Sequence, residues 1–308
     1  MRTEHFWWRR RGVLVGAYVA LLLVSTIVRR IQSRSGVSEG MRVASLRTID
    51  RGRAAPGQIR LAFIDTSPGA KSMPVVLVHG SPGTSSVFGS VTPALAPGFR
   101  VIVPDLPGFG ASTHELPDYS FRAHAQYILE LLDELRIRKA QLVGFSMGGG
   151  VVLSMADIAP ERVASIVLLS AIGVQEQELL GSYWGNHVLH GAQLGALWLL
   201  REGAPHFGVL DQFALDVKYA RNFYDSDQRP LRSILQRYKG PMLILHGNGD
   251  PLVPVAAALE HHQLVPQSQL KVIDGDHFMV LPAASCHPRA HGGFPAAHCA
   301  SGAVVEFT

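Results

Sequence analysis

Residues 142–150 read Leu142-Val143-Gly144-Phe145-Ser146-Met147-Gly148-Gly149-Gly150, and a helical pattern follows from Val151 to Ala156. The first of these residues form an apolar run typical of a buried strand, and the next five form a G-x-S-x-G turn. Such a turn pushes the serine hydroxyl outward, and glycine is needed on both sides because a side chain would collide with the neighbouring backbone. The pattern therefore predicts that Ser146 is a nucleophile beside a helix N-terminus, which stabilises negative charge.

Three further motifs accompany this turn. They are His79-Gly80-Ser81-Pro82-Gly83, Gly247-Asn248-Gly249-Asp250 and Gly275-Asp276-His277-Phe278. Together the four motifs, within about residues 57–282, resemble the α/β-hydrolase superfamily. The resemblance implies an α/β fold with a mostly parallel sheet flanked by helices, and a catalytic triad in the chain order Ser146, Asp250, His277.

The chemistry follows from the residue types. A serine hydroxyl is a weak nucleophile at neutral pH, so His277 is expected to take its proton while Asp250 holds the imidazole. Asp276 is the alternative acid, ranked below Asp250 because a side chain adjacent in sequence rarely reaches back to the ring. The backbone N–H groups of Ser81 and Met147 are the expected oxyanion hole.

Apolar runs predict the strands of the sheet. They lie at residues 59–64, 74–78, 164–170, 241–245 and 270–273, with a further strand starting at Val101, and residues 119–135 read as an amphipathic helix. Alternating strands and helices indicate a parallel sheet with right-handed crossovers. We expect Asp105, in a proline and glycine turn after one of these strands, to hold its loop rather than to act as the catalytic acid.

The same patterns divide the chain into parts. Residues 57–173 and 239–282 are the expected hydrolase core, residues 174–238 an inserted helical cap, and residues 35–56 a linker. In the cap we expect a helix over residues 192–201 and a second helix capped by Asp211, with Phe213, Val217, Ala220 and Tyr224 on one face. A cap over the serine would line an apolar substrate pocket.

The N-terminal residues 1–34 predict a membrane anchor. An uncharged run from Gly12 to Val28 lies between arginine clusters, and Trp7 and Trp8 stand where interfacial aromatic residues occur. We expect one uncleaved transmembrane segment. The alternative is a cleaved signal peptide that leaves a secreted or periplasmic protein.

Residues 283–308 change abruptly to Ala, Pro, Gly, His and Cys without a helical period. The superfamily closes with a helix at this point, and this tail is expected to replace it, as a frameshifted or truncated reading frame would. The two cysteines, Cys286 and Cys299, match no zinc spacing with the nearby histidines, so no metal is expected. No motif calls for a cofactor. The formal charge of +4 gathers at the N-terminal arginines, which argues against a nucleic-acid partner.

The predicted function is a membrane-anchored serine hydrolase that cleaves a small carboxylic ester through an acyl-enzyme. Three alternatives stay open: a cofactor-free haloperoxidase or perhydrolase, which residues 144–150 resemble; a carbon–carbon bond hydrolase on the same triad; and a catalytically silent, membrane-tethered scaffold. The serine nucleophile argues against the dehalogenase and epoxide hydrolase branches, which use aspartate.

Overall fold

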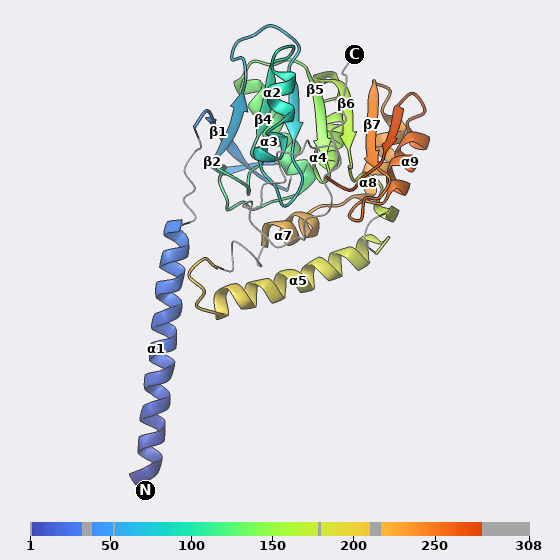
Figure 1. Ribbon diagram of the computed structural model, residues 1–308. Coiled ribbons are helices and arrows are strands. Elements are labelled where there is room, and N and C mark those ends of the chain that lie inside the picture. The colour runs from blue at the N-terminus through green and yellow to red at the C-terminus, as the bar shows by residue number, and fades with distance from the viewer. Residues whose placement is uncertain (1, 33–38, 52, 178–179, 210–216, 279–308) are drawn as a thin grey trace.

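A mostly parallel sheet runs through the domain in the order β1-β2-β4-β3-β5-β6-β7-β8 (Figure 1). This computed structural model describes residues 2–32, 39–51, 53–177, 180–209 and 217–278. The strands are β1 Arg42–Asp50, β2 Arg53–Asp65, β3 Val75–Val78, β4 Val101–Pro104, β5 Ala140–Phe145, β6 Val163–Leu169, β7 Met242–Gly247 and β8 Gln269–Ile273. Strand β2 pairs antiparallel with β1 and β4, and the other pairs are parallel. The expected α/β fold is confirmed.

Helices cover both faces of the sheet. On one face, α3 Phe121–Glu134, α4 Gly148–Ile158, α8 Arg229–Arg237 and α9 Val255–Leu264 contribute to the larger core cluster. On the other face, the 3₁₀ helix η1 Ser85–Phe88 and the short α2 Val91–Leu95 contribute Phe88 and Leu95 to a second cluster. The central strands β3 and β4 are buried throughout. Continuous apolar strands are therefore explained by burial on both faces.

Helix α3 shows why the helical pattern was readable. It begins after Ser120, whose side chain accepts a hydrogen bond from the Ala123 N–H, as an N-cap does. Ala123, Tyr127 and Leu131 recur at four-residue spacing and are fully buried. The helix expected over residues 119–135 is confirmed, and the observed helix is slightly shorter at both ends.

The interpretation of residues 35–56 as a linker is wrong for the part that the structure describes. From Arg42 the chain forms the edge strand β1 and the start of β2. Ala44 and Leu46 are buried, whereas Arg42 and Arg47 on either side of them are exposed. Exposed arginines on an edge strand are compatible with strand structure, and they hid the alternation in the sequence.

Pro56 also suggested a break in the chain. The pairing partner of Arg47 is Gln58 and that of Thr48 is Ala55, so Pro56 and Gly57 fall in an irregularity of the ladder. Proline is tolerated at such a bulge because its missing N–H costs no ladder hydrogen bond.

The expected cap is helical. Helix α5 Tyr183–Gly203 contains the segment expected over residues 192–201, and α7 Val217–Asp225 packs against it (Figure 1). The proposed capping residue Asp211 and its neighbour Phe213 lie outside the described residues. The cap boundary at residue 238 is wrong, because α8 packs on α4 and α9 and contributes Leu231, Ile234 and Leu235 to the core.

The N-terminal segment is one long helix, α1 Arg2–Gln32, which extends away from the domain (Figure 1). Its part Arg11–Ile31 has a mean hydropathy of 2.0 and is long and apolar enough to cross a membrane. A signal sequence shares these two properties. The predicted atypical tail at residues 283–308 lies outside the described residues.

Candidate active site

The turn at Ser146 has the geometry that its glycines predicted. Ser146 joins β5 to α4 with a φ of 53°, a left-handed conformation that is rare for a residue with a side chain. A Cβ on Gly144 would lie 2.6 Å from the Gly148 carbonyl oxygen, and one on Gly148 would lie 2.2 Å from the Val78 carbonyl oxygen. Glycine is therefore the residue that fits on either side of the half-buried serine.

Asp250 and His277 meet at the ends of β7 and β8. The His277 Nδ1 lies 2.7 Å from Asp250 Oδ2, and both residues are buried. Asp250 Oδ1 accepts hydrogen bonds from the N–H groups of Leu252 and Val253, at 2.8 and 2.9 Å. Burial raises the pKa of Asp250, but the hydrogen bonds from His277 and the two N–H groups outweigh it, so this pKa lies below its usual value.

This pair fixes the tautomer of the imidazole. An ionised carboxylate only accepts hydrogen bonds, so His277 Nδ1 carries the proton and Nε2 keeps a lone pair. The His277 ring packs beside Phe145, the residue before Ser146, with ring centroids 5.1 Å apart. Among the described residues no hydrogen bond joins Ser146 Oγ to His277, a contact that in enzymes without substrate is often long.

The alternative acid, Asp276, is engaged elsewhere. Its Oδ1 accepts a hydrogen bond of 2.9 Å from the Phe278 N–H, two residues further along the chain. The structure brings Asp250 rather than Asp276 to the histidine ring.

The loop after β3 lies directly against Ser146. A Cβ on Gly80 would lie 2.8 Å from the Ser146 Cβ. Neither the Ser81 N–H nor the Met147 N–H donates a hydrogen bond to another residue in the part of the chain that the structure describes. Met147 directly follows Ser146, and Ser81 follows Gly80, so both N–H groups remain candidates for the expected oxyanion hole.

His79 holds this loop in place. Its Nε2 accepts a hydrogen bond of 2.9 Å from the Leu106 N–H, so the proton sits on Nδ1, which donates to the Gly80 carbonyl at 2.7 Å. Burial lowers the pKa of His79, which keeps the ring neutral at physiological pH. His79 therefore links the ends of β3 and β4.

Asp105 has the structural role expected for it. Its two carboxylate oxygens accept hydrogen bonds from the N–H groups of Ser85 and Ala111, at 2.7 and 2.8 Å. A Cβ on Gly110 would lie 2.1 Å from Asp105 Oδ2, so the loop closes tightly around the carboxylate. Asp105 thereby fixes two loops beneath the site.

The sequence reasoning gave no role to His246. This residue is 1% exposed, donates from Nε2 to the Val253 carbonyl at 2.8 Å, and lies 3.5 Å from Asp250 Oδ2. Burial lowers its pKa, so the ring is neutral and supports the loop that carries the acid. The sequence signal for His246 is that it is a polar residue at the end of an apolar strand.

The segment that leads from β6 into the cap begins beside Ser146. Ser146 donates its N–H to the Leu169 carbonyl at the end of β6, and the Ile172 N–H donates to the Ser146 carbonyl.

A separate groove of about 870 Å³ lies between the cap and the β1–β2 turn, and its lining includes Arg51, Trp198 and Tyr224 but no residue of the expected triad. Within the described residues no group of three His, Cys, Asp or Glu side chains could hold a metal ion.

Comparison with known proteins agrees with this geometry. The sequence profile of the alpha/beta hydrolase fold family matches residues 73–185. The chain is 32% identical over 235 residues to the dihydrolipoyllysine-residue acetyltransferase component of the acetoin cleaving system of Pseudomonas putida, covering 70% of this chain but only 61% of that protein. It is 30% identical over 233 residues to a 2-hydroxy-6-oxo-2,4-heptadienoate hydrolase of Pseudomonas putida, covering 65% of this chain and 80% of the hydrolase.

Among solved structures, a thermophilic esterase from Thermogutta terrifontis superposes with a TM-score of 0.62 at 25% identity, over 78% of this chain and 93% of the esterase. The family profile includes the loop after β3 and the turn at Ser146, and at 30% identity the chain covers 80% of the heptadienoate hydrolase. The chain therefore belongs to the α/β-hydrolase family.

Proposed function

We propose that this protein is a serine hydrolase that cleaves carboxylic esters through an acyl-enzyme. The observation that carries the proposal is the hydrogen bond between Asp250 and His277, with the ring beside the strained turn of Ser146. The likeness to an esterase supports an ester as the substrate.

In the proposed reaction, His277 Nε2 takes the Ser146 proton while Oγ attacks the ester carbonyl carbon. The carbonyl π electrons move to oxygen, and the N–H groups of Ser81 and Met147 stabilise the resulting oxyanion. Collapse of this intermediate breaks the bond to the alcohol, which leaves with the proton from His277. Water then attacks the acyl-enzyme with the same base, and Asp250 stabilises the imidazolium in both steps.

A carbon–carbon bond hydrolase is the second candidate. It is favoured by the similarity to the heptadienoate hydrolase, which covers most of that protein's length. The haloperoxidase or perhydrolase reading and the silent scaffold remain as further alternatives. We expect the cap to line the pocket that distinguishes these substrates.

The test is hydrolysis of p-nitrophenyl esters of increasing acyl length by the full chain in detergent micelles, beside Ser146→Ala. Ser154→Ala is a matched control, since this buried serine lies on α4 and donates to the Gly150 carbonyl. Turnover that is lost only in Ser146→Ala supports the ester hydrolase. A folded wild type that cleaves no ester but cleaves a vinylogous diketone would favour the second candidate.

We further propose that α1 anchors the protein in a membrane without being cleaved. The support is its length and apolar character together with its contacts to the domain, which a cleaved segment would lose. Alkaline carbonate extraction of membranes tests this. The full-length chain should stay in the pellet, and a shortened, soluble chain would contradict the anchor.

A further inference from the structure

The cap helix α5 exposes apolar side chains and buries polar ones. No Asp, Glu, Lys or Arg occurs from Tyr183 to Leu200. The exposed large apolar side chains of the helix are Trp184, Val188, Leu189, Trp198, Leu199 and Leu200, which we call the outer face of α5. Trp198, at one edge of this face, also borders the groove beside the β1–β2 turn. Its buried residues, Asn186 and His190, are polar. This is the reverse of the arrangement expected for a helix on the surface of a water-soluble domain.

The outer face is continuous rather than scattered. At about 100° per residue, Trp184, Val188 and Leu199 fall within roughly 60° of one another around the helix, with the remaining large apolar side chains on either side. The small residues Ala192, Gly195 and Ala196 are exposed between them. A contiguous exposed apolar surface is typical of an interaction site.

Helix α5 is attached to the candidate membrane span. The Tyr18 hydroxyl donates a hydrogen bond to the Gly203 carbonyl at the end of α5, and Arg29 pairs with Glu202 at 3.4 Å. Ser25, which is 1% exposed, accepts hydrogen bonds from the N–H groups of His206 and Phe207, at 3.1 and 2.9 Å. These three residues of α1 all lie within Arg11–Ile31, so any bilayer that contains this segment also reaches the end of α5.

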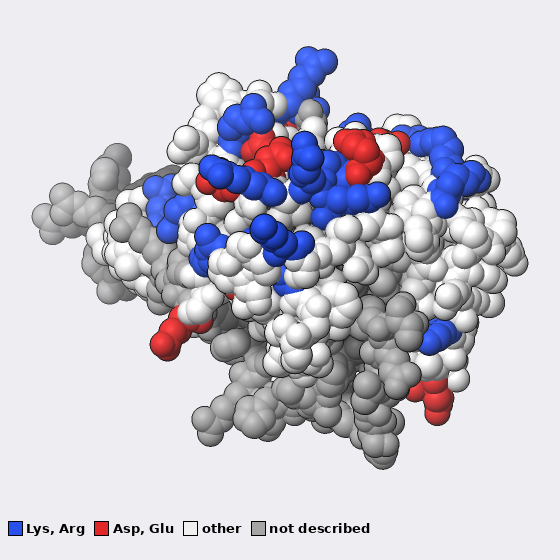
Figure 2. Space-filling view, turned by 90° about the horizontal axis from the view of Figure 1, so that it is seen from above, with Lys and Arg blue, Asp and Glu red and all other residues white. Residues whose placement is uncertain are grey.

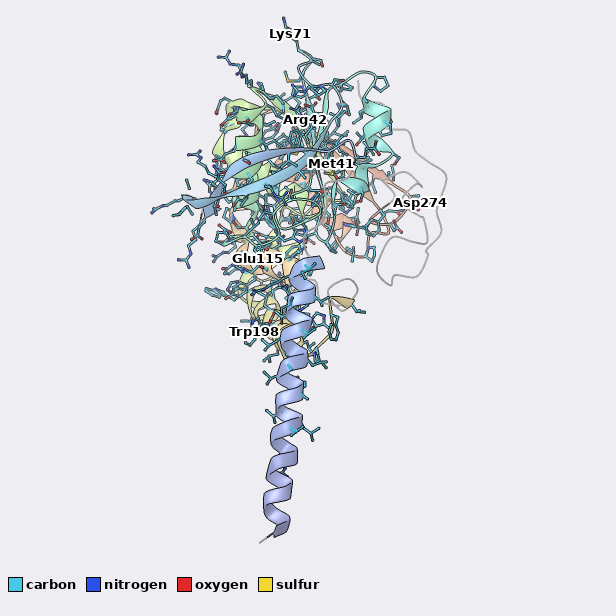
Figure 3. All side chains as sticks on the ribbon, turned by 90° about the vertical axis from the view of Figure 1, so that its left-hand side faces the viewer. Met41, Arg42, Lys71, Glu115, Trp198 and Asp274 are labelled. Atoms are coloured by element: carbon cyan, nitrogen blue, oxygen red, sulfur yellow. The ribbon has the colours of Figure 1, made fainter. Side chains whose placement is uncertain are left out.

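The arrangement of the helices fits a bilayer. Helix α5 runs crosswise to α1, along the end of the domain from which α1 extends (Figure 1). Trp198 lies at that end, whereas Lys71 lies at the opposite end (Figure 3). The face of the domain seen from above, away from α1, carries many Lys, Arg, Asp and Glu side chains (Figure 2).

We propose that the outer face of α5 lies in the boundary between headgroups and acyl chains of the same bilayer that α1 spans. A helix in this position buries its apolar side chains in lipid, with tryptophan at the interface. The inference rests on the proposed anchoring by α1. In this arrangement the cap itself contacts the membrane, and the side of the domain that carries the cap faces the lipid.

The positions of the tryptophans allow a direct test. The chain has four of them, Trp7 and Trp8 in α1 and Trp184 and Trp198 on the outer face of α5. With Trp7→Phe and Trp8→Phe, the full chain is reconstituted into phosphatidylcholine vesicles with or without bromine on the acyl chains. We expect blue-shifted emission and a loss of fluorescence with brominated lipid.

Val188→Asp, placed on the outer face, should weaken the quenching. Leu259→Asp is the control, because Leu259 is also an exposed apolar residue but lies on α9. Hydrolysis of a soluble short-chain ester checks that each variant is folded. Quenching that is equal in both variants would overturn the assignment of the contact to this face.

Three outcomes overturn the proposal, and they are distinguishable. Emission typical of indole in water, without quenching, from a chain that resists carbonate extraction would refute the α5 contact and leave the α1 anchor standing. Blue-shifted emission without quenching by brominated lipid would mean that a second copy of the chain covers the face. Release of the chain by carbonate would refute the anchor and the α5 contact together, while ester hydrolysis would remain a separate question.

Discussion

Asp250 and His277 lie 27 positions apart in the chain and meet at 2.7 Å through a buried carboxylate and a ring nitrogen. The contact joins the loop after β7 to the loop after β8, and the histidine ring packs beside Phe145 at the end of β5. Three strand ends of the parallel sheet therefore converge on one site, as expected where open α/β sheets place their functional loops.

Replacing the acid should abolish most activity without unfolding the protein. Asp250→Asn keeps the shape of the side chain but removes the negative charge that holds the His277 tautomer, and we expect kcat to fall by roughly 10⁴-fold. Asp276→Asn is the control, because among the described residues its carboxylate accepts a hydrogen bond from the Phe278 N–H and makes none to His277. Steady-state ester hydrolysis measures both, and equal losses in the two variants would contradict the assigned triad.

The approach of Gly80 to the serine can be tested by a single methyl group. Gly80→Ala places a Cβ within 2.8 Å of the Ser146 Cβ, so we expect the loop to shift and kcat to fall by roughly tenfold or more. Gly98→Ala meets no atom within 4 Å and should leave kcat unchanged. An unaltered kcat in Gly80→Ala would show that the loop is not positioned against the nucleophile.

Asp105 should matter for stability. Asp105→Asn removes the charge that binds the Ser85 and Ala111 N–H groups, and the free energy of unfolding should fall by about 1–3 kcal/mol. Asp274→Asn, at an exposed position, should be neutral. Urea unfolding in detergent compares the two variants. An unchanged free energy of unfolding in Asp105→Asn would show that these hydrogen bonds do not contribute to stability.

The buried His124 should make the fold sensitive to acid. Burial lowers its pKa from 6.5 to about 3, and neither ring nitrogen has a hydrogen-bond partner among the described residues. As pH falls below 6.5 the unfolded chain binds a proton that the folded chain refuses, so stability is lost between pH 6.5 and about 3.

His124→Leu should remove this contribution. Between pH 7 and pH 5 the wild type should lose roughly 2 kcal/mol more than the variant in free energy of unfolding. Urea titrations at the two pH values measure the difference. A loss as large in the variant as in the wild type would contradict a neutral buried His124.

The sequence predicted the parts of the site that depend on local rules. The turn at Ser146 was readable because its glycines are required by contacts within a few residues, and Asp250 and His277 follow apolar strands in the chain order of the family. Strand β1 was missed because its arginines and the bulge at Pro56 obscure the alternation, and pairing with β2 decides its structure.

Contacts between distant segments could not be predicted. The hydrogen bond from Tyr18 to Gly203 joins residues 185 positions apart, and no pattern in either helix specifies its partner. The same holds for the packing of α8 on α4 and α9, which placed this helix in the core rather than in the cap. Tertiary packing decides such assignments.

The most direct test of the central claim is covalent labelling of the nucleophile. The full chain, in detergent, is treated with a fluorophosphonate, and the labelled peptide is located by mass spectrometry. We predict one phosphonyl group, attached to Ser146, and a strongly reduced rate of labelling in His277→Ala. A folded chain that remains unlabelled, or that is labelled at another serine, would contradict the assignment of Ser146 as the activated nucleophile.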